Sequence, residues 1–199
     1  MARQRAWRTL VLLIAGLAPV AAAAATGATA AAAPAPAPDR AAIQGSYLLA
    51  GGHAAWLFDP GRGARGFTAE AVFHPDVVGQ FSARLARHRV GLCLRFNRSV
   101  VVDRLGTKGA EISLRRWLGR DGRPLAPFVE LGVGQYQVDY ERGAGDRSTW
   151  SALLGLGAER PLGGRWLLAG AFQLRSLELA AESLSHAGFT LTLGGRIDS

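Results

Sequence analysis

Hydrophobic and polar residues alternate with a period of two along most of the chain after residue 46. In the segment FTLTLGGRI, Phe189, Leu191 and Leu193 alternate with Thr190 and Thr192. Successive side chains of a β-strand point to opposite faces of a sheet, so this pattern predicts a strand with one apolar and one polar face. The alternation recurs in GFTAEAVF, RVGLCLRF, GAEISLRRWL, PFVELGVGQYQVDY and STWSALLGLGAER, and more weakly in SYLLAGGHAAWLF. The chain is therefore predicted to be an all-β protein.

The segment RWLLAGAFQLRSLEL, residues 165–179, is compatible with either a helix or a strand. Its Leu and Ala content suits a helix, and several of its apolar residues fall near helical spacing. With a period of two, Trp166 and Phe172 share one face, and Gln173 and Arg175 share the other. Both neighbouring segments are predicted strands, which favours the strand interpretation.

The connections between these segments alternate in kind, and this alternation indicates the topology. GRDGRPLA and RPLGGR are short, whereas DPGRGARG, NRSVVVDRLGTKG, ERGAGDRST and ELAAESLSHA are generally longer and more polar. HPDVVGQFSARLA departs from the scheme, because it is long where a short turn is expected. Short turns at one end and longer loops at the other are typical of an up-and-down barrel. We expect about eight antiparallel strands.

Two architectures fit such strands, and they differ in which face points inward. A soluble barrel or sandwich buries its apolar face, whereas a membrane barrel turns its apolar face to lipid and its polar face to the lumen. The polar positions here carry Glu and Arg interleaved with Gly, Ser and Thr. Glycine weakens an ordinary strand but suits a small, tightly curved barrel with a crowded lumen. The pattern favours a closed, antiparallel, up-and-down transmembrane β-barrel, because an open sheet edge is costly in lipid.

Two sets of residues follow from that architecture. Charged side chains of the polar face are predicted to form a structural ion-pair network in the lumen: Glu111, Arg115, Glu130, Glu159, Arg175 and Arg196. An eight-stranded barrel has no room for a wide aqueous channel, so a porin role is not expected. Trp117, Trp150 and Trp166 lie near predicted strand ends, which predicts an aromatic girdle at the membrane–water interfaces. The alternative for these tryptophans is an ordinary core or edge position.

The first 45 residues differ in composition from the rest. Residues 1–25 carry three arginines, then an apolar run and an alanine-rich tail, which is the order of a secretory signal peptide. The alternative is an uncleaved membrane anchor, which the shortness of the run and Pro19 disfavour. Alternating Ala and Pro predict an extended linker over residues 26–45. The barrel domain is predicted over residues 46–199.

Charge and cysteine content limit the partners and the metal sites that the chain is expected to have. The formal net charge of the whole chain is +8, but the basic residues are scattered and show no interleaving with aromatic residues. Nucleic acid is therefore not an expected partner, whereas anionic lipid headgroups are. Cys93 is the only cysteine, which excludes an intramolecular disulfide and a cysteine-based metal cluster. No cofactor and no metal site are expected.

The second half of the folded part resembles the small bacterial outer-membrane β-barrel family, the eight-stranded outer membrane protein β-barrel domain. PFVELGVGQYQVDY, WSALLGLGAERPLGGRWLLAGAFQLRSLEL and FTLTLGGRI are similar to that family's C-terminal strands, so the resemblance covers residues 110–197. It implies the outer membrane of a Gram-negative bacterium, contact with outer-membrane lipid including lipopolysaccharide, and insertion by the outer-membrane assembly machinery. Members of the family usually end on an aromatic residue used in assembly, whereas this chain ends GGRIDS.

Some barrels of that family modify lipid A, and a deacylase would need a His and a Ser two positions apart on a late strand. Ser185 and His186 are adjacent here, so on a strand they point to opposite faces. The favoured function is a structural or adhesive barrel without catalysis, whose loops at Asn97–Gly109 and Glu141–Thr149 carry any contacts. The alternatives are deacylase-like chemistry near Ser185 and His186, and a soluble periplasmic barrel that binds an apolar ligand.

Overall fold

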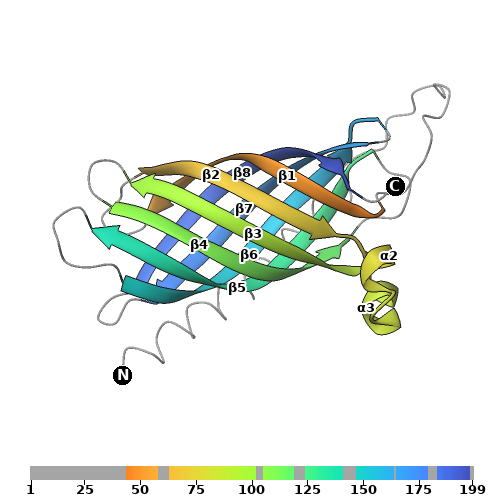
Figure 1. The fold of residues 1–199 in the computed structure, drawn as a ribbon, viewed down its shortest axis with the longest axis horizontal. Coiled ribbons are helices and arrows are strands. Elements are labelled where there is room, and N and C mark those ends of the chain that lie inside the picture. The colour runs from red at the N-terminus through yellow and green to blue at the C-terminus, as the bar shows by residue number, and fades with distance from the viewer. Residues whose placement is uncertain are drawn as a thin grey trace, which may run out of the picture. The chain divides into compact units, whose positions relative to one another are not determined.

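The computed structural model describes residues 44–57, 63–101, 105–118, 124–140, 147–163, 165–178 and 183–197 of the 199-residue chain. These residues form eight antiparallel strands that close into a barrel (Figure 1). The strands are β1 (Ser46–Leu57), β2 (Gly63–Phe73), β3 (Val90–Val101), β4 (Leu105–Trp117), β5 (Ala126–Tyr140), β6 (Arg147–Pro161), β7 (Trp166–Glu178) and β8 (Ser183–Arg196). Each strand pairs with its sequence neighbours, and β1 closes the sheet against β8. The predicted all-β, closed, up-and-down barrel is confirmed.

The strands alternate between an apolar outer face and a polar inner face. On β4, Glu111, Ser113 and Arg115 are at most 3% exposed, whereas Ile112 and Leu114 between them are each 49% exposed. The exposed large apolar side chains of the other strands include Leu48, Phe67, Leu94, Phe96, Leu131, Val133, Phe172, Phe189, Leu191 and Leu193. We call these outward apolar side chains, with those of β4, the apolar belt. This distribution is that of a membrane barrel and the reverse of a soluble one.

The outer face of β4 shows where the apolar belt ends. Ala110, Ile112 and Leu114 form its apolar outer row, and Lys108 and Arg116 lie at the two ends of that row. A rise of ~3.4 Å per residue and a strand tilt of ~40° place these two cations about 20 Å apart along the barrel axis. Long basic side chains reach beyond their own Cα atoms, so this spacing fits the ~25 Å apolar band of outer-membrane barrels.

Residues 165–179, which fit either a helix or a strand by pattern, form strand β7 from Trp166 to Glu178. Gln173 is fully buried and Arg175 is 5% exposed, whereas Phe172 is 46% exposed. The two polar side chains therefore point into the barrel and the aromatic ring points outward, as the strand interpretation predicts.

The predicted surface loop Asn97–Gly109 is wrong over most of its length, because β3 and β4 extend into it. Asn97 is 3% exposed, and its Nδ2 donates a hydrogen bond to Glu111 inside the barrel (3.1 Å). Polar outer residues are compatible with strand here, because strands that extend beyond the lipid need no apolar outer face. In the second predicted loop, Glu141–Thr149, the last three residues belong to β6 and the first six lie outside the described residues.

The segment HPDVVGQFSARLA contains two short helices, α2 (Pro75–Val78) and α3 (Ala83–Arg87). Pro75 suits the first position of α2, and Oγ of Ser82 accepts a hydrogen bond from the Leu85 N–H at the start of α3 (3.4 Å). The helices connect β2 to β3 where β1 begins and β8 ends (Figure 1). We call this the terminal end of the barrel and the opposite one the loop end.

Two expectations concern parts of the chain outside the barrel. The predicted signal peptide, residues 1–25, lies outside the described residues, as does the predicted linker, residues 26–45, apart from its last two residues. Within the described part, no helix is both long enough and apolar enough to cross a membrane.

Candidate functional site

The polar inner face brings opposite charges into direct cross-strand register. Glu70 on β2 lies opposite Arg95 on β3, which in turn lies opposite Glu111 on β4. Arg115 on β4 lies opposite Glu130 on β5. Directly opposite residues point to the same face with Cβ atoms about 5 Å apart. The pairing register of the sheet therefore places each of these cations beside a carboxylate.

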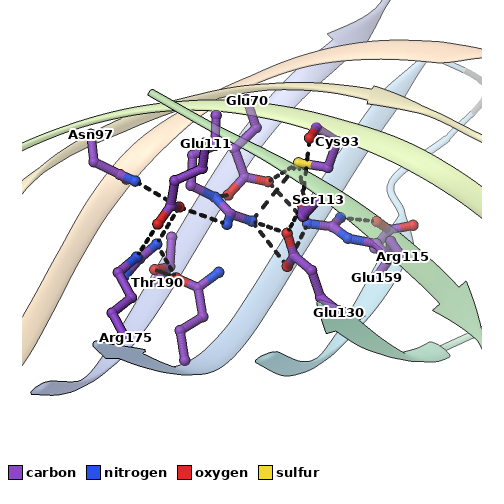
Figure 2. A network of polar contacts seen from close by, with 12 residues as sticks. Glu70, Cys93, Asn97, Glu111, Ser113, Arg115, Glu130, Glu159, Arg175 and Thr190 are labelled. Carbon is purple, nitrogen blue, oxygen red and sulfur yellow. Dashed lines mark hydrogen bonds and ion pairs between the residues drawn. The ribbon is translucent and has the colours of Figure 1, made fainter. Parts of the chain in front are cut away.

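Arg95 lies at the centre of these contacts, between Glu70, Glu111 and Glu130, three carboxylates that Figure 2 labels. Its Nε lies 2.8 Å from a Glu70 oxygen, and its Nη2 lies 2.9 Å from Glu130. Nη1 of the same guanidinium lies 3.3 Å from Glu111. One planar cation thus contacts three carboxylates from three strands, which suits the several donors of an Arg side chain.

Arg115 and Arg175 extend the cluster across the barrel. Nη1 of Arg115 lies 2.5 Å from Glu159 on β6, and Nε of Arg175 on β7 lies 2.7 Å from Glu111. We define the lumen network as Glu70, Arg95, Glu111, Arg115, Glu130, Glu159 and Arg175. All seven residues are at most 5% exposed, so their charges are shielded from bulk water.

His74 lies beside the lumen network at the terminal end. Its Nδ1 lies 3.1 Å from the Gly45 carbonyl oxygen, and its Nε2 lies 2.9 Å from a Glu159 oxygen. Within the network, each of the four carboxylates has an arginine nitrogen within 2.9 Å. Each buried carboxylate therefore has an opposite charge beside it, which reduces the cost of burying it.

Neutral side chains add hydrogen bonds to the network. Nδ2 of Asn97 donates to Glu111 (3.1 Å) and to the Tyr136 hydroxyl (2.8 Å). The Ser113 hydroxyl donates to Glu130. These contacts satisfy carboxylate lone pairs that the arginines leave free, and they fix the side chains in one arrangement.

An apolar cluster fills the lumen beside the network, towards the terminal end. Tyr47, Trp117, Phe128 and Leu167 are each at most 5% exposed and lie near the terminal ends of their strands. The Arg115 guanidinium carbon lies 4.0 Å from the centre of the Phe128 ring, a cation–π contact that joins the cluster to the network. Side chains of the cluster and the network therefore occupy this part of the lumen, as expected for a barrel of eight strands.

Five of the six predicted network residues lie in the lumen network, and Arg196 does not. Arg196 is exposed at the last residue of β8, so its prediction is wrong although its parity is that of the inner face. Sequence reasoning misses Glu70, Arg95 and His74 as network members. Glu70 and Arg95 carry the same signal as the others, a charged residue at a polar position of an alternating strand. His74 follows the end of β2 and carries no such signal.

The predicted aromatic girdle needs one correction. Trp117 is 4% exposed, and its Nε1 donates to Glu159 in the lumen (2.9 Å), so its placement at the membrane interface is wrong. It shares the parity of Arg115, which also points inward. Trp150 and Trp166 are 66% and 56% exposed near the loop end of β6 and the terminal end of β7. Their position at the two membrane interfaces remains a prediction.

Gly134 leaves the space that the Glu111 side chain occupies. A Cβ atom there would lie 2.6 Å from the Ala110 carbonyl oxygen and 2.7 Å from Cγ of Glu111. We therefore expect Gly134→Ala to destabilise the barrel by roughly 1–3 kcal/mol through overpacking, measured by urea unfolding in lipid vesicles. Gly170→Ala is the matched control, because a Cβ there meets nothing closer than 3.5 Å. Equal losses in both variants would contradict a crowded lumen.

The described serine–histidine pairs lack the geometry of a nucleophile and its base. His186 lies opposite Arg175 and points inward, so the adjacent Ser185 points outward. Nε2 of His53 lies 2.5 Å from the Ser99 hydroxyl, but its Nδ1 has no hydrogen-bond partner among the described residues. A catalytic base normally has an orienting group on that nitrogen. The described residues also hold no group of three or more His, Cys, Asp or Glu side chains placed to bind a metal ion.

Three solved structures are similar to this barrel. Neisserial surface protein A has 10% sequence identity and a TM-score of 0.59, over 77% of this chain and 98% of its own. Outer membrane protein OprG from Pseudomonas aeruginosa has 11% identity and a TM-score of 0.51, over 80% and 99%. The N-terminal β-barrel domain of OprF from the same organism has 14% identity and a TM-score of 0.50, over 76% and 98%. The likeness establishes the fold of an eight-stranded barrel of the outer-membrane type.

Comparison with protein-family models gives no match, and comparison with curated protein sequences gives none either.

Proposed function

We propose that this protein is a structural or adhesive β-barrel in the outer membrane of a Gram-negative bacterium, without catalytic activity. The lumen network is the observation that carries the proposal. A channel or a substrate site needs polar groups that face an open space, whereas these charged groups face one another. The apolar belt supports the location, because an apolar outer surface bounded by cations about 20 Å apart on a closed barrel is that of a barrel surrounded by lipid.

The loop end supports the structural role more than the adhesive one. Successive strands are separated there by residues 58–62, 102–104, 141–146 and 179–182, so each connection has at most six residues. Binding surfaces in barrels and sandwiches are commonly built by longer loops on a rigid scaffold. Any adhesive contact at this end would therefore involve the strand ends as well.

Lipopolysaccharide is the proposed lipid partner at the loop end. Arg98 and Lys108 lie opposite each other on β3 and β4, and Arg65 faces outward on β2 beside them. On their own strands Arg98 follows Phe96 and Lys108 precedes Ala110, so these cations lie at the loop-end edge of the apolar belt, where lipid phosphate groups are expected. Insertion of the barrel by the outer-membrane assembly machinery belongs to the same proposal.

Fractionation of cells that express the full chain tests the location. The protein is expected in the outer-membrane fraction, extracted only with detergent, and with a gel mobility that changes on heating as closed barrels show. Recovery of the folded chain in a detergent-free periplasmic extract would favour the soluble alternative and contradict the proposal.

The enzyme alternative has its own test in the same cells. Ser185→Ala and His186→Ala are expected to leave the acylation pattern of lipid A unchanged, measured by mass spectrometry of extracted lipid A. An acylation change that depends on the wild-type chain and disappears in either variant would establish deacylase-like chemistry and overturn the non-catalytic role.

A further inference from the structure

The terminal end carries the longest connection between two strands, residues 74–89 between β2 and β3. Its helices α2 and α3 pack against β3 and lie at the edge of the barrel (Figure 1). Phe81, between the two helices, is 88% exposed, more than any other large apolar side chain in the described part of the chain. Exposure of an aromatic ring to water is unfavourable, whereas its insertion at a membrane–water interface is favourable.

Exposed arginines surround the same end of the barrel. Arg84 and Arg87 lie on α3, Arg116 and Arg160 face outward at the ends of β4 and β6, and Arg165 precedes β7. We call these five residues the arginine collar. A cation beside an anionic membrane surface is attracted to it, and the effect adds up over several neighbours.

Among the residues that the structure describes, acidic side chains do not offset the arginine collar. Of the acidic side chains that the structure describes, only Asp76 is exposed at the terminal end. Both of its carboxylate oxygens accept from the Gly45 N–H, at 3.1 and 2.9 Å. Glu159 lies near this end too, but it is fully buried within the lumen network.

The arginine collar lies at the edge of the apolar belt. Arg116 is two residues beyond Leu114 on the outer face of β4, and Arg165 directly precedes the exposed Trp166. From the middle of the barrel towards this end, the outer surface is first apolar, then carries an aromatic ring, and then carries cations. A membrane has its layers in the same order: hydrocarbon, interface and phosphate groups. Arginine also presents a planar pair of donors that matches two phosphate oxygens.

We propose that the arginine collar binds the phosphate groups of anionic phospholipids in the leaflet at the terminal end, with Phe81 anchoring the α2–α3 connection in that interface. The inference rests on the proposed membrane location of the barrel. Continuity with the apolar belt favours lipid over a hydrophilic anionic polymer such as peptidoglycan, because such a polymer would leave Phe81 exposed to water.

A fluorescent probe on the α2–α3 connection tests this inference. Gln80 is exposed next to Phe81, and Gln80→Cys in a Cys93→Ala background gives one site for an environment-sensitive label. The labelled full chain is refolded into vesicles of phosphatidylcholine alone or with increasing phosphatidylglycerol. We expect the probe to become shielded from acrylamide, a neutral aqueous quencher that the vesicle charge does not repel, as the phosphatidylglycerol fraction rises. Heat-modifiable gel mobility, measured on the same samples, reports insertion of the barrel separately.

Two matched pairs of substitutions separate the loss of charge from other effects of substitution. Arg84→Gln with Arg87→Gln is expected to raise the phosphatidylglycerol fraction needed for half-shielding about fivefold or more. Arg84→Lys with Arg87→Lys keeps both charges at the same positions and is expected to stay within about twofold of the unsubstituted chain. A probe equally open to acrylamide in all inserted samples, or shielded only when peptidoglycan is added, would overturn the inference. A chain that fails to insert at all would instead contradict the membrane location.

Discussion

Replacement of Arg95 by Met is expected to destabilise the folded barrel by about 3–5 kcal/mol, because it leaves buried carboxylates without their cation. Arg95 contacts Glu70, Glu111 and Glu130 within 3.3 Å, and all four side chains are shielded from water. Low polarity makes an unpaired charge expensive, and the surrounding strands leave these carboxylates no route to solvent. Urea unfolding in lipid vesicles, followed by tryptophan fluorescence, measures the loss.

Two comparisons show whether charge balance causes that loss. Arg98→Met removes an exposed arginine from the outer face of the same strand, and a change within about 0.5 kcal/mol is expected. Arg95→Met combined with Glu70→Gln restores the balance of buried charges and is expected to recover part of the stability. If Arg95→Met costs no more than Arg98→Met, the lumen network does not hold the barrel together as argued.

Replacement of Ile112 by Arg is expected to destabilise the barrel almost as much as loss of Arg95, because it places a charge in lipid rather than removing one from the lumen. Ile112 is 49% exposed on the outer face of β4, midway between Lys108 and Arg116. A basic side chain on the lipid face near the middle of the bilayer costs about 2–4 kcal/mol and much less near the interfaces. Ile112→Arg is therefore expected to lose that much stability in vesicles. Gln137→Arg, opposite Lys108 on β5, is expected to be nearly neutral.

If the barrel were soluble and Ile112 faced water, the Ile112→Arg substitution would give a different result. On the outer surface of a soluble barrel an arginine at this position would face water and improve solubility, with little effect on unfolding. An unchanged free energy of unfolding for Ile112→Arg in lipid would therefore contradict the assignment of the outer face to the membrane.

The alternation of apolar and polar residues predicts the strands and their faces, because the face of each side chain follows from its position relative to the adjacent residues of the same strand. Gln173 and Arg175 show this, since once the neighbouring strands favour a strand over 165–179, the period of two places both on the inner face of β7. The same parity places Trp117 beside Arg115 on the inner face, and the girdle interpretation fails because it uses the residue's position along the strand rather than its parity. A tryptophan at a strand end faces lipid or lumen according to parity.

Contacts between strands need the register, which the sequence pattern does not supply. Glu70 and Arg95 are opposite each other because Phe73 pairs with Leu92 across the α2–α3 connection, and the alternation does not give that register. Arg196 has the parity of the inner face but lies at the barrel rim, and parity gives no information on height along the barrel. His74 reaches Glu159 through the α2–α3 connection, whose helices interrupt the strand pattern.

The apolar face of every strand is expected to meet lipid, while the polar face meets the lumen. Spin labels placed singly at residues 189 to 193 of β8, in a Cys93→Ala background, test it through their collisions with oxygen in the bilayer and with a water-soluble nickel complex. We predict high oxygen accessibility at positions 189, 191 and 193, low accessibility to both reagents at positions 190 and 192, and gel mobility that still changes on heating. Nickel accessibility at positions 189, 191 and 193, or a variation with the period of a helix, would contradict the account.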